Sequence, residues 1–260
     1  MRRRRHCRSS LLGILLLSAS LLADDRPRIA IIIDDLGNER RNGVRAIQLD
    51  GPIAYAILPG TPRARELAEL AHAAGRDVLL HLPLQAEADL ESRQPGGLNL
   101  DMSRQAFSLA VTRSLDAVPH VIGINTHRGS LLTRHPGHMG WLMDDLGRRD
   151  GLFFVDSYTT ADSVALRIAR ERGIPSMRRD VFLDPDRRLD TVEREFARLK
   201  SIAQARGYAV GIGHPYPETL DFLDRALPGL DAEGFALVPI SELVTQHDRQ
   251  GLDPRIASGE

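Results

Sequence analysis

The chain has 260 residues, 42% of them hydrophobic and 27% charged, which is the composition of a globular protein able to bury one sizeable core. Its formal net charge of −1 gives no basic excess, which argues against nucleic acid as a partner. The single cysteine, Cys7, excludes an internal disulfide, so core packing must stabilise the fold.

The N-terminus has the three-part pattern of a secretory signal. Five arginines within residues 1–8 precede an apolar run from Leu11 to Ala23, and the polar pair Asp24-Asp25 follows. This thirteen-residue run is shorter than the roughly 20 residues of a membrane-spanning helix, so a retained membrane anchor is only the alternative interpretation. We expect cleavage after Ser20 or Ala23 and export of the mature protein to the periplasm.

The expected organisation is a signal peptide over residues 1–23, one domain over residues 24–246 and a polar tail over residues 247–260. Loss of the signal arginines leaves 29 basic and 35 acidic residues, a net charge of −6 with histidine neutral. The mature chain is therefore expected to bind no nucleic acid and to have no stable insertion in the membrane. The tail lacks hydrophobic periodicity, so we expect it to be poorly ordered.

Short apolar runs alternate with helical patterns from Arg28 onward, which favours parallel strands joined by helices. Apolar stripes at helical spacing, expected to be core, span residues 67–74, 107–118 and 192–203. Eight strand–helix steps in about 230 mature residues favour a closed or nearly closed (β/α) barrel of seven to eight strands, and an open doubly wound sheet is the alternative. The strand candidates are Ile29–Ile33, Ile53–Ile57, Val78–Leu80, Val121–Ile124, Leu152–Val155, Ser176–Met177 running toward Phe182, Ala209–Ile212 and Ala236–Val238.

Polar residues that could take part in catalysis or bind a metal follow six of these apolar runs. Functional side chains of parallel α/β folds gather at the carboxyl ends of strands, so these residues are expected to meet at one end of the barrel. Independent helix caps need not recur at almost every strand end, which favours a shared site. In chain order the residues are Asp34 and Asp35, His81, His127, Asp156, Arg179 and Asp180, and His214.

The adjacent acids Asp34 and Asp35 point to a metal. On leaving an apolar strand they are expected to face opposite sides, and two buried carboxylates would repel each other without a cation. His81 and His127 can supply neutral nitrogen ligands beside one carboxylate. Two imidazoles and a carboxylate leave a coordination position for water, as in hydrolytic zinc sites, so we expect a divalent metal and specifically zinc.

Five strings of the sequence resemble the motifs of the divergent polysaccharide deacetylases, in that family's order, between about Arg28 and Gln246. The resemblance implies an irregular (β/α) barrel of the glycoside hydrolase/deacetylase superfamily. The strings are Ile31-Ile32-Ile33-Asp34-Asp35-Leu36-Gly37, His81-Leu82-Pro83-Leu84, Gly123-Ile124-Asn125-Thr126-His127-Arg128-Gly129-Ser130, Arg179-Asp180-Val181-Phe182-Leu183-Asp184 and Gly213-His214-Pro215.

By this resemblance Asp34 is the general base, Asp35 a metal ligand and His214 the general acid. The better-characterised polysaccharide deacetylases take their second histidine ligand four residues after the first. Gln85 stands at that position here, so His127 would replace the missing ligand.

Two further roles complete the proposed machinery. An acidic partner, Asp156 or Asp180, is expected to orient His214. Arg179 is expected to keep Asp34 ionised through its positive charge.

The resemblance implies a metal-dependent hydrolase that removes N- or O-acetyl groups from a cell-envelope polysaccharide. A catalytically silent periplasmic glycan-binding or regulatory module on the same barrel is the alternative, because a fold does not fix a function. Another metal-assisted hydrolysis, such as phosphoester cleavage, is a third hypothesis.

Overall fold

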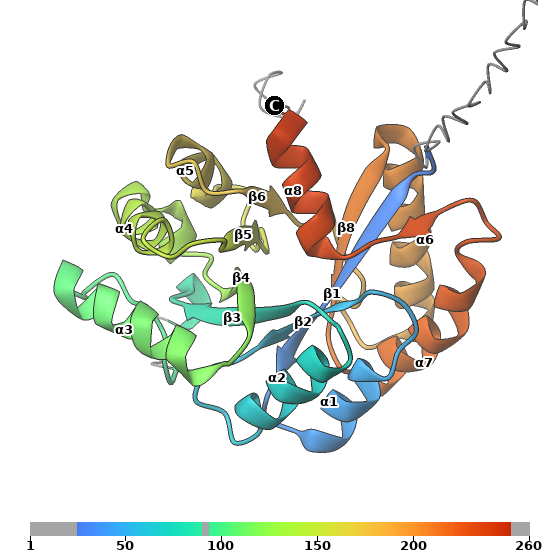
Figure 1. The fold of residues 1–260 in the computed structure, drawn as a ribbon, viewed down its shortest axis with the longest axis horizontal. Coiled ribbons are helices and arrows are strands. Elements are labelled where there is room, and N and C mark those ends of the chain that lie inside the picture. Colours follow the sequence, from blue (N-terminus) through green and yellow to red (C-terminus); the bar gives the residue numbers. More distant parts are fainter. Residues whose placement is uncertain (1–24, 90–93, 251–260) are drawn as a thin grey trace, which may run out of the picture.

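The computed structural model describes residues 25–89 and 94–250, and over these the chain alternates strands and helices as its apolar runs predict (Figure 1). The predicted signal peptide and residues 251–260 of the predicted tail lie outside the described residues. The strands are β1 (Arg28–Leu36), β2 (Ala54–Ile57), β3 (Val78–Leu84), β4 (Val121–Arg128), β5 (Phe153–Asp156), β6 (Ser176–Arg178), β7 (Val181–Phe182), β8 (Tyr208–Gly213) and β9 (Ala236–Leu237). The helices are α1 (Arg40–Ile47), α2 (Ala64–Ala73), α3 (Arg104–Ala117), α4 (Pro136–Leu146), α5 (Ala165–Glu171), α6 (Leu189–Arg206), α7 (Pro217–Ala226) and α8 (Ile240–Gln250).

The strands form one parallel sheet that curls into an irregular barrel. Their order is β6-β5-β4-β3-β2-β1-β8-β7, with β9 beside β1. Strands β6 and β7 follow each other in the chain yet lie at opposite ends of this order, so the sheet must curl round to bring them together. Helix α8 lies between β6 and β8, while the other helices surround the ring (Figure 1). The predicted (β/α) barrel is thus confirmed.

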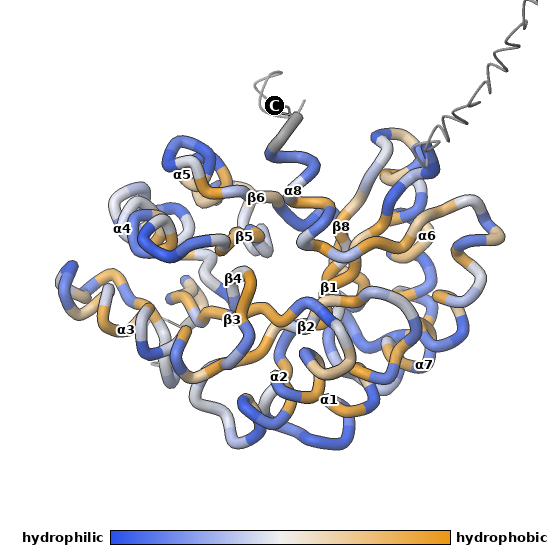
Figure 2. Tube along the Cα trace, in the orientation of Figure 1, coloured by the Kyte–Doolittle hydropathy of each residue, from blue (hydrophilic) through white to orange (hydrophobic). Residues whose placement is uncertain are grey.

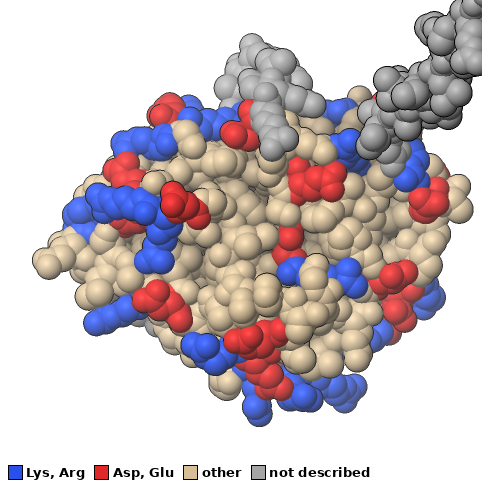
Figure 3. Space-filling model, viewed as in Figure 1, with Lys and Arg blue, Asp and Glu red and all other residues tan. Residues whose placement is uncertain are grey.

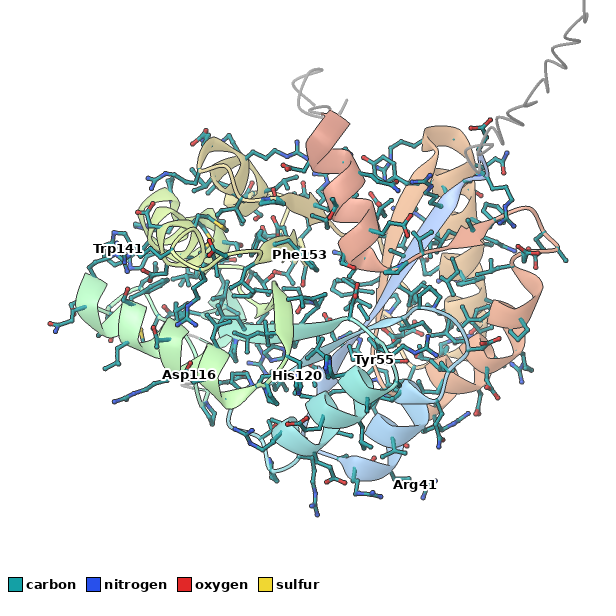
Figure 4. All side chains as sticks on the ribbon, in the orientation of Figure 1. Arg41, Tyr55, Asp116, His120, Trp141 and Phe153 are labelled. Atoms are coloured by element: carbon teal, nitrogen blue, oxygen red, sulfur yellow. The ribbon has the colours of Figure 1, made fainter. Side chains whose placement is uncertain are left out.

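The period-two alternation of β1 divides the core into two layers. Ile29, Ile31 and Ile33 pack in the cluster shared with the surrounding helices. Ala30 and Ile32 belong to a second cluster, which contains inward residues of the other strands and apolar residues of α8. Figure 2 shows the strands as the most hydrophobic part of the trace, and Figure 4 places Phe153, a member of the second cluster, near the centre of the ring.

The first predicted helical stripe is only partly buried. Leu67 and Ala71 are buried in α2, but Leu70 is 38% exposed, because the helix turns Ala64 and Ala68 toward the sheet instead. Gly75 takes a φ of +69° directly after this helix, in the left-handed region that ends helices most readily at glycine.

Helix α8 continues through residues 247–250, where the sequence analysis placed the start of a disordered tail. His247 is buried and its ring lies 5.3 Å from that of Tyr208. The predicted tail boundary is therefore wrong by one helical turn.

Within residues 25–89 and 94–250, no helix combines the length and the apolar character needed to cross a membrane. Positive and negative side chains are interspersed over the face seen in Figure 3.

Candidate metal and catalytic site

A break in strand β1 brings both adjacent acids into one site. The β1–β2 register shifts between Ile33 and Leu36, and Asp35 has a φ of 60°, which is uncommon for a residue with a side chain. As a result Asp34 and Asp35 both reach His81, at 3.7 Å and 3.1 Å from its Nε2. The expectation that the two carboxylates face opposite sides is wrong, since it assumed a regular strand.

Asp35, His81 and His127 converge on a common point, as predicted for the metal ligands. Oδ1 of Asp35 lies 2.8 Å from Nδ1 of His127 and 3.1 Å from Nε2 of His81, and the two nitrogens are 3.1 Å apart. These three atoms form a group that could hold a metal ion.

The surroundings of Asp35 favour the ionised form of its carboxyl group. Oδ1 of Asp35 is buried and has no aligned hydrogen-bond donor, so its lone pairs face the gap between the imidazoles. Burial would raise the pKa of Asp35, but the close approach of His127 and His81 outweighs it and holds the pKa well below its ordinary value. Two imidazole nitrogens and one ionised carboxylate fit a zinc-type ion.

Asn125 links the metal-binding group to the predicted base. Its side-chain amide donates to Oδ1 of Asp34 at 2.6 Å, so its carbonyl oxygen is free to accept from Nδ1 of His81 at 2.7 Å. A proton on Nδ1 leaves the Nε2 lone pair of His81 directed at the site, as a metal ligand requires. Asn125 was not among the site residues predicted from the sequence, although its position two before His127 in β4 puts both on one face of the strand.

Asp34 is 2% exposed and has a perturbed acidity. Burial raises the pKa of its carboxyl above the ordinary value, although the positive charges of His81 and His214 oppose the shift. A carboxylate with a raised pKa is a stronger base near neutral pH. Its environment therefore matches the role of general base.

His214 faces the same site from the end of β8. Its Nε2 lies 3.9 Å from Oδ2 of Asp35, and its Nδ1 lies 2.8 Å from Oδ1 of Asp184. The other oxygen of Asp184 accepts from the backbone N–H of His214 and from the hydroxyl of Thr219. Burial lowers the pKa of His214, but the hydrogen bond and charge of Asp184 and the charges of Asp34 and Asp35 raise it to about 9.

The prediction that Asp156 or Asp180 orients His214 is wrong, since Asp184 is its acidic partner. Asp156 instead accepts from the backbone N–H of Tyr158 at 2.8 Å and from the hydroxyl of Ser163 at 2.6 Å. Asp180 forms a two-pronged ion pair with Arg206.

Strand register explains the difference. Phe182 of β7 pairs with Ile212 of β8, so the residues two further along, Asp184 and His214, are brought side by side.

Arg179 borders the site, but its guanidinium is hydrogen-bonded to backbone oxygens and not to Asp34. Its guanidinium donates to the carbonyl oxygens of Ser157 and Tyr158 at 2.7 Å and 2.8 Å and lies 3.6 Å from the ring centre of Phe182. Burial lowers its pKa to about 10 while three carboxylates, Asp34 among them, oppose that shift. Arg179 thus supports the loop after β5, and its charge acts on Asp34 through space.

Asp35 and His127 line a cavity of about 400 Å³ that is walled by the loops after β2 and β3.

Trp141, the single tryptophan, lies on α4, away from the ring of strands, and packs edge-on against Phe107 of α3 (Figure 4). It supplies no platform for a ligand at the site.

A family model described as divergent polysaccharide deacetylase matches residues 31–244. An uncharacterized protein of Haemophilus influenzae is 36% identical over 216 residues, which cover 83% of this chain and 76% of that protein. The uncharacterized protein YibQ of Escherichia coli K12 is 33% identical over 234 residues, which cover 90% of this chain and 72% of that protein.

Solved structures share the fold. Uncharacterized protein ATU2773 of Agrobacterium tumefaciens C58 superposes with a TM-score of 0.80 at 22% identity, covering 84% of this chain and 89% of that one. The catalytic domain of a peptidoglycan N-acetylglucosamine deacetylase from Eubacterium rectale gives 0.52 at 16% identity, covering 82% and 88%. Wild-type BA3943 of Bacillus anthracis, a CE4 family pseudoenzyme, gives 0.51 at 15% identity, covering 85% and 66%. At these identities the likeness concerns the fold alone.

Proposed function

Because this chain belongs to the divergent polysaccharide deacetylase family, we propose that it is a metal-dependent hydrolase that removes N- or O-acetyl groups from a cell-envelope polysaccharide. The supporting observation is the convergence of Asp35, His81 and His127 on one point, with Asp34 3.7 Å from His81 and the imidazole of His214 3.9 Å from Asp35. A ligand group flanked by a candidate base and a candidate acid is the arrangement that acyl hydrolysis requires.

The ion would be held by Asp35, His81 and His127. When bound there it would polarise the acetyl carbonyl and lower the pKa of water. Nitrogen-rich ligation disfavours magnesium and calcium, which prefer all-oxygen sites, and zinc is our proposed ion.

The residues of the chain account for the proton transfers. Asn125 holds Oδ1 of Asp34, so Oδ2 is the oxygen that accepts a proton from the attacking water. Asp184 holds Nδ1 of His214, which leaves Nε2 to protonate the departing amine or alcohol. Base and acid thus act from the ends of two different strands, β1 and β8, and the products are acetate and the free amine or alcohol.

A second function, a catalytically silent glycan-binding or regulatory module, is favoured by one residue. Gln85 occupies the position where the better-characterised polysaccharide deacetylases carry their second histidine, and its side-chain oxygen accepts from the backbone N–H of Leu100 at 2.9 Å. Gln85 therefore stabilises a loop. The complete ligand group around His127 favours the hydrolase over this alternative.

We further propose that the protein acts in the periplasm, where its substrate would be found. The motivation is the arginine cluster and apolar run of residues 1–23.

The hydrolase is tested with the mature chain, zinc and an acetylated cell-envelope polysaccharide, with release of acetate as the readout. Asp34→Asn and His214→Ala are each expected to lower the rate by about 10²- to 10⁴-fold, because each removes one proton transfer. Both variants must keep their metal and their circular dichroism spectrum. Equal rates in all three proteins would reject the assignment, and absence of acetate release by each would favour the silent module.

A further inference from the structure

A layered stack of side chains leads from the general acid to an arginine at the surface. The ring of Tyr216 stacks on His214, with centroids 5.3 Å apart and planes 27° from parallel. On Tyr216 lies the guanidinium of Arg187, 4.1 Å from the ring centre. Tyr216 is half-buried and Arg187 is exposed, so the cation reaches solvent one ring away from the catalytic histidine.

Arg187 has no ion pair among the described residues, although acids surround it in the sequence. Asp186 accepts from the backbone N–H of Arg188 and from the hydroxyl of Thr191. Asp190 pairs with the guanidinium of Arg188, at 2.7 Å and 3.0 Å. These two carboxylates are therefore engaged within the loop and by the neighbouring arginine, which leaves the charge of Arg187 available to a ligand.

The backbone beneath Arg187 is restricted. Tyr216 stands between Pro215 and Pro217, at the residue before helix α7 begins. Proline fixes its own backbone φ and restricts the residue before it, so the backbone that carries the tyrosine ring has few conformations. A guanidinium held over a ring by a cation–π contact can still donate from its N–H groups to an oxyanion.

We propose that Arg187, held on Tyr216, binds a negatively charged substituent of the substrate, so that the site acts on an acidic glycan. The substituent is a carboxylate or a phosphate, since both match the donor edge of a guanidinium. The inference rests on the proposed deacetylase function and specifies its substrate class. In this arrangement the acetyl group lies at Asp35 and His127, and the anionic group lies beyond His214 on the Tyr216 side.

Binding is measured by calorimetry on the zinc-loaded mature chain in an Asp34→Asn background, which prevents turnover. The probes are a tetrasaccharide of alternating N-acetylglucosamine and N-acetylmuramic acid, the same tetrasaccharide with its carboxylates reduced to alcohols, and N-acetylglucosamine 6-phosphate beside N-acetylglucosamine. The first pair tests a carboxylate and the second pair a phosphate.

The matched variants are Arg187→Gln and Arg188→Gln. Each removes one exposed charge from the same loop, but Arg188 already pairs with Asp190. We expect one of the acidic probes to bind about tenfold more tightly than its neutral partner, which corresponds to about 1.4 kcal/mol. Arg187→Gln should abolish this preference, and Arg188→Gln should retain it.

The proposal is overturned if neither acidic probe binds better than its neutral partner, or if Arg187→Gln keeps the preference. Acetate release from both tetrasaccharides is measured in parallel on protein that retains Asp34. This measurement tests the hydrolase independently of the charge preference. Turnover without charge preference retains the hydrolase and rejects the role of Arg187. Charge-dependent binding without turnover rejects the hydrolase and supports the role of Arg187.

Discussion

Nδ1 of His214 lies 2.8 Å from the carboxylate of Asp184, a residue thirty positions earlier in the chain. This contact links the loops after β7 and β8 and sets both the orientation and the charge of the imidazole. Together with the charges of Asp34 and Asp35, it raises the pKa of His214 to about 9 in spite of burial.

Asp184→Asn should therefore lower the pKa of His214 toward the ordinary value of about 6.5. A pKa that is higher in the folded state gives stability that is complete below about pH 6.5 and is lost as the pH rises through about 9. The variant should be less stable than the wild type by about 1–3 kcal/mol at pH 6, with a smaller difference at pH 9. Histidine NMR titration and urea unfolding of the metal-free protein measure the two effects.

Asp180→Asn is the control for this change, since Asp180 pairs with Arg206. It should leave the titration of His214 in place. An unchanged pKa of His214 in Asp184→Asn would contradict the assigned partner.

Asn125→Ala should weaken zinc binding by about 10- to 100-fold, because His81 loses the acceptor that fixes the proton on its Nδ1. The measurement is zinc competition with a coloured chelator. Thr126→Ala is the matched control, since Thr126 is equally buried in β4 but its hydroxyl accepts from the backbone of Ser157. Equal zinc affinities in the two variants would show that Asn125 does not position the ligand.

His81→Ala and His127→Ala should each lose most of their bound metal, because one donor of three is removed. Elemental analysis of untagged protein gives the metal-to-protein ratio. His135→Ala is the control, since His135 is exposed and lies at the start of α4. Full occupancy in both ligand variants would mean that the ion is held elsewhere.

Asp145→Ala should destabilise the fold by about 1–3 kcal/mol at pH 7, because its carboxylate accepts two hydrogen bonds from Arg104 and one from the hydroxyl of Ser108. Burial would raise the pKa of Asp145, but the bonds from Arg104 and Ser108 lower it. A lowered pKa gives stability that is present above the unfolded value of about 3.9 and disappears as the pH falls further.

The difference between wild type and variant should therefore shrink below about pH 4, as measured by urea unfolding across the pH range. Asp144→Ala is the control, because Asp144 pairs with Arg172 at the exposed surface. Its effect should stay within about 0–1 kcal/mol.

Export predicts a new N-terminus after Ser20 or Ala23 in protein recovered from the cell envelope. Mass spectrometry of the intact protein identifies it. A chain that still begins at Met1 in the cytoplasmic fraction would reject cleavage.

The barrel and much of the site could be predicted from the sequence, because each rests on a local pattern. Runs of β-branched residues set the strands, and the residue after each run falls at the same end of a parallel sheet. This strand-end pattern predicts that Asp35, His81 and His127 lie together. The helix over 247–250 was missed because its apolar contact, the ring of Tyr208, is distant in sequence.

Two features of the site depend on geometry that a single sequence does not display. The partner of His214 follows from the β7–β8 register, and β7 has only two residues. The shared direction of Asp34 and Asp35 follows from the positive φ at Asp35, an uncommon conformation for aspartate.

The junction of Arg179 and Asp180, which joins β6 to β7, has a consequence for association between molecules. Exposed sheet edges recruit strands from other chains, and long flat edges are sites of aggregation. In the described part of this chain the two strands at the ends of the main sheet order have three and two residues, and the junction ties them to each other. Little edge is therefore offered to a second molecule at these two strands, and a cut or insertion at this junction would expose both edges.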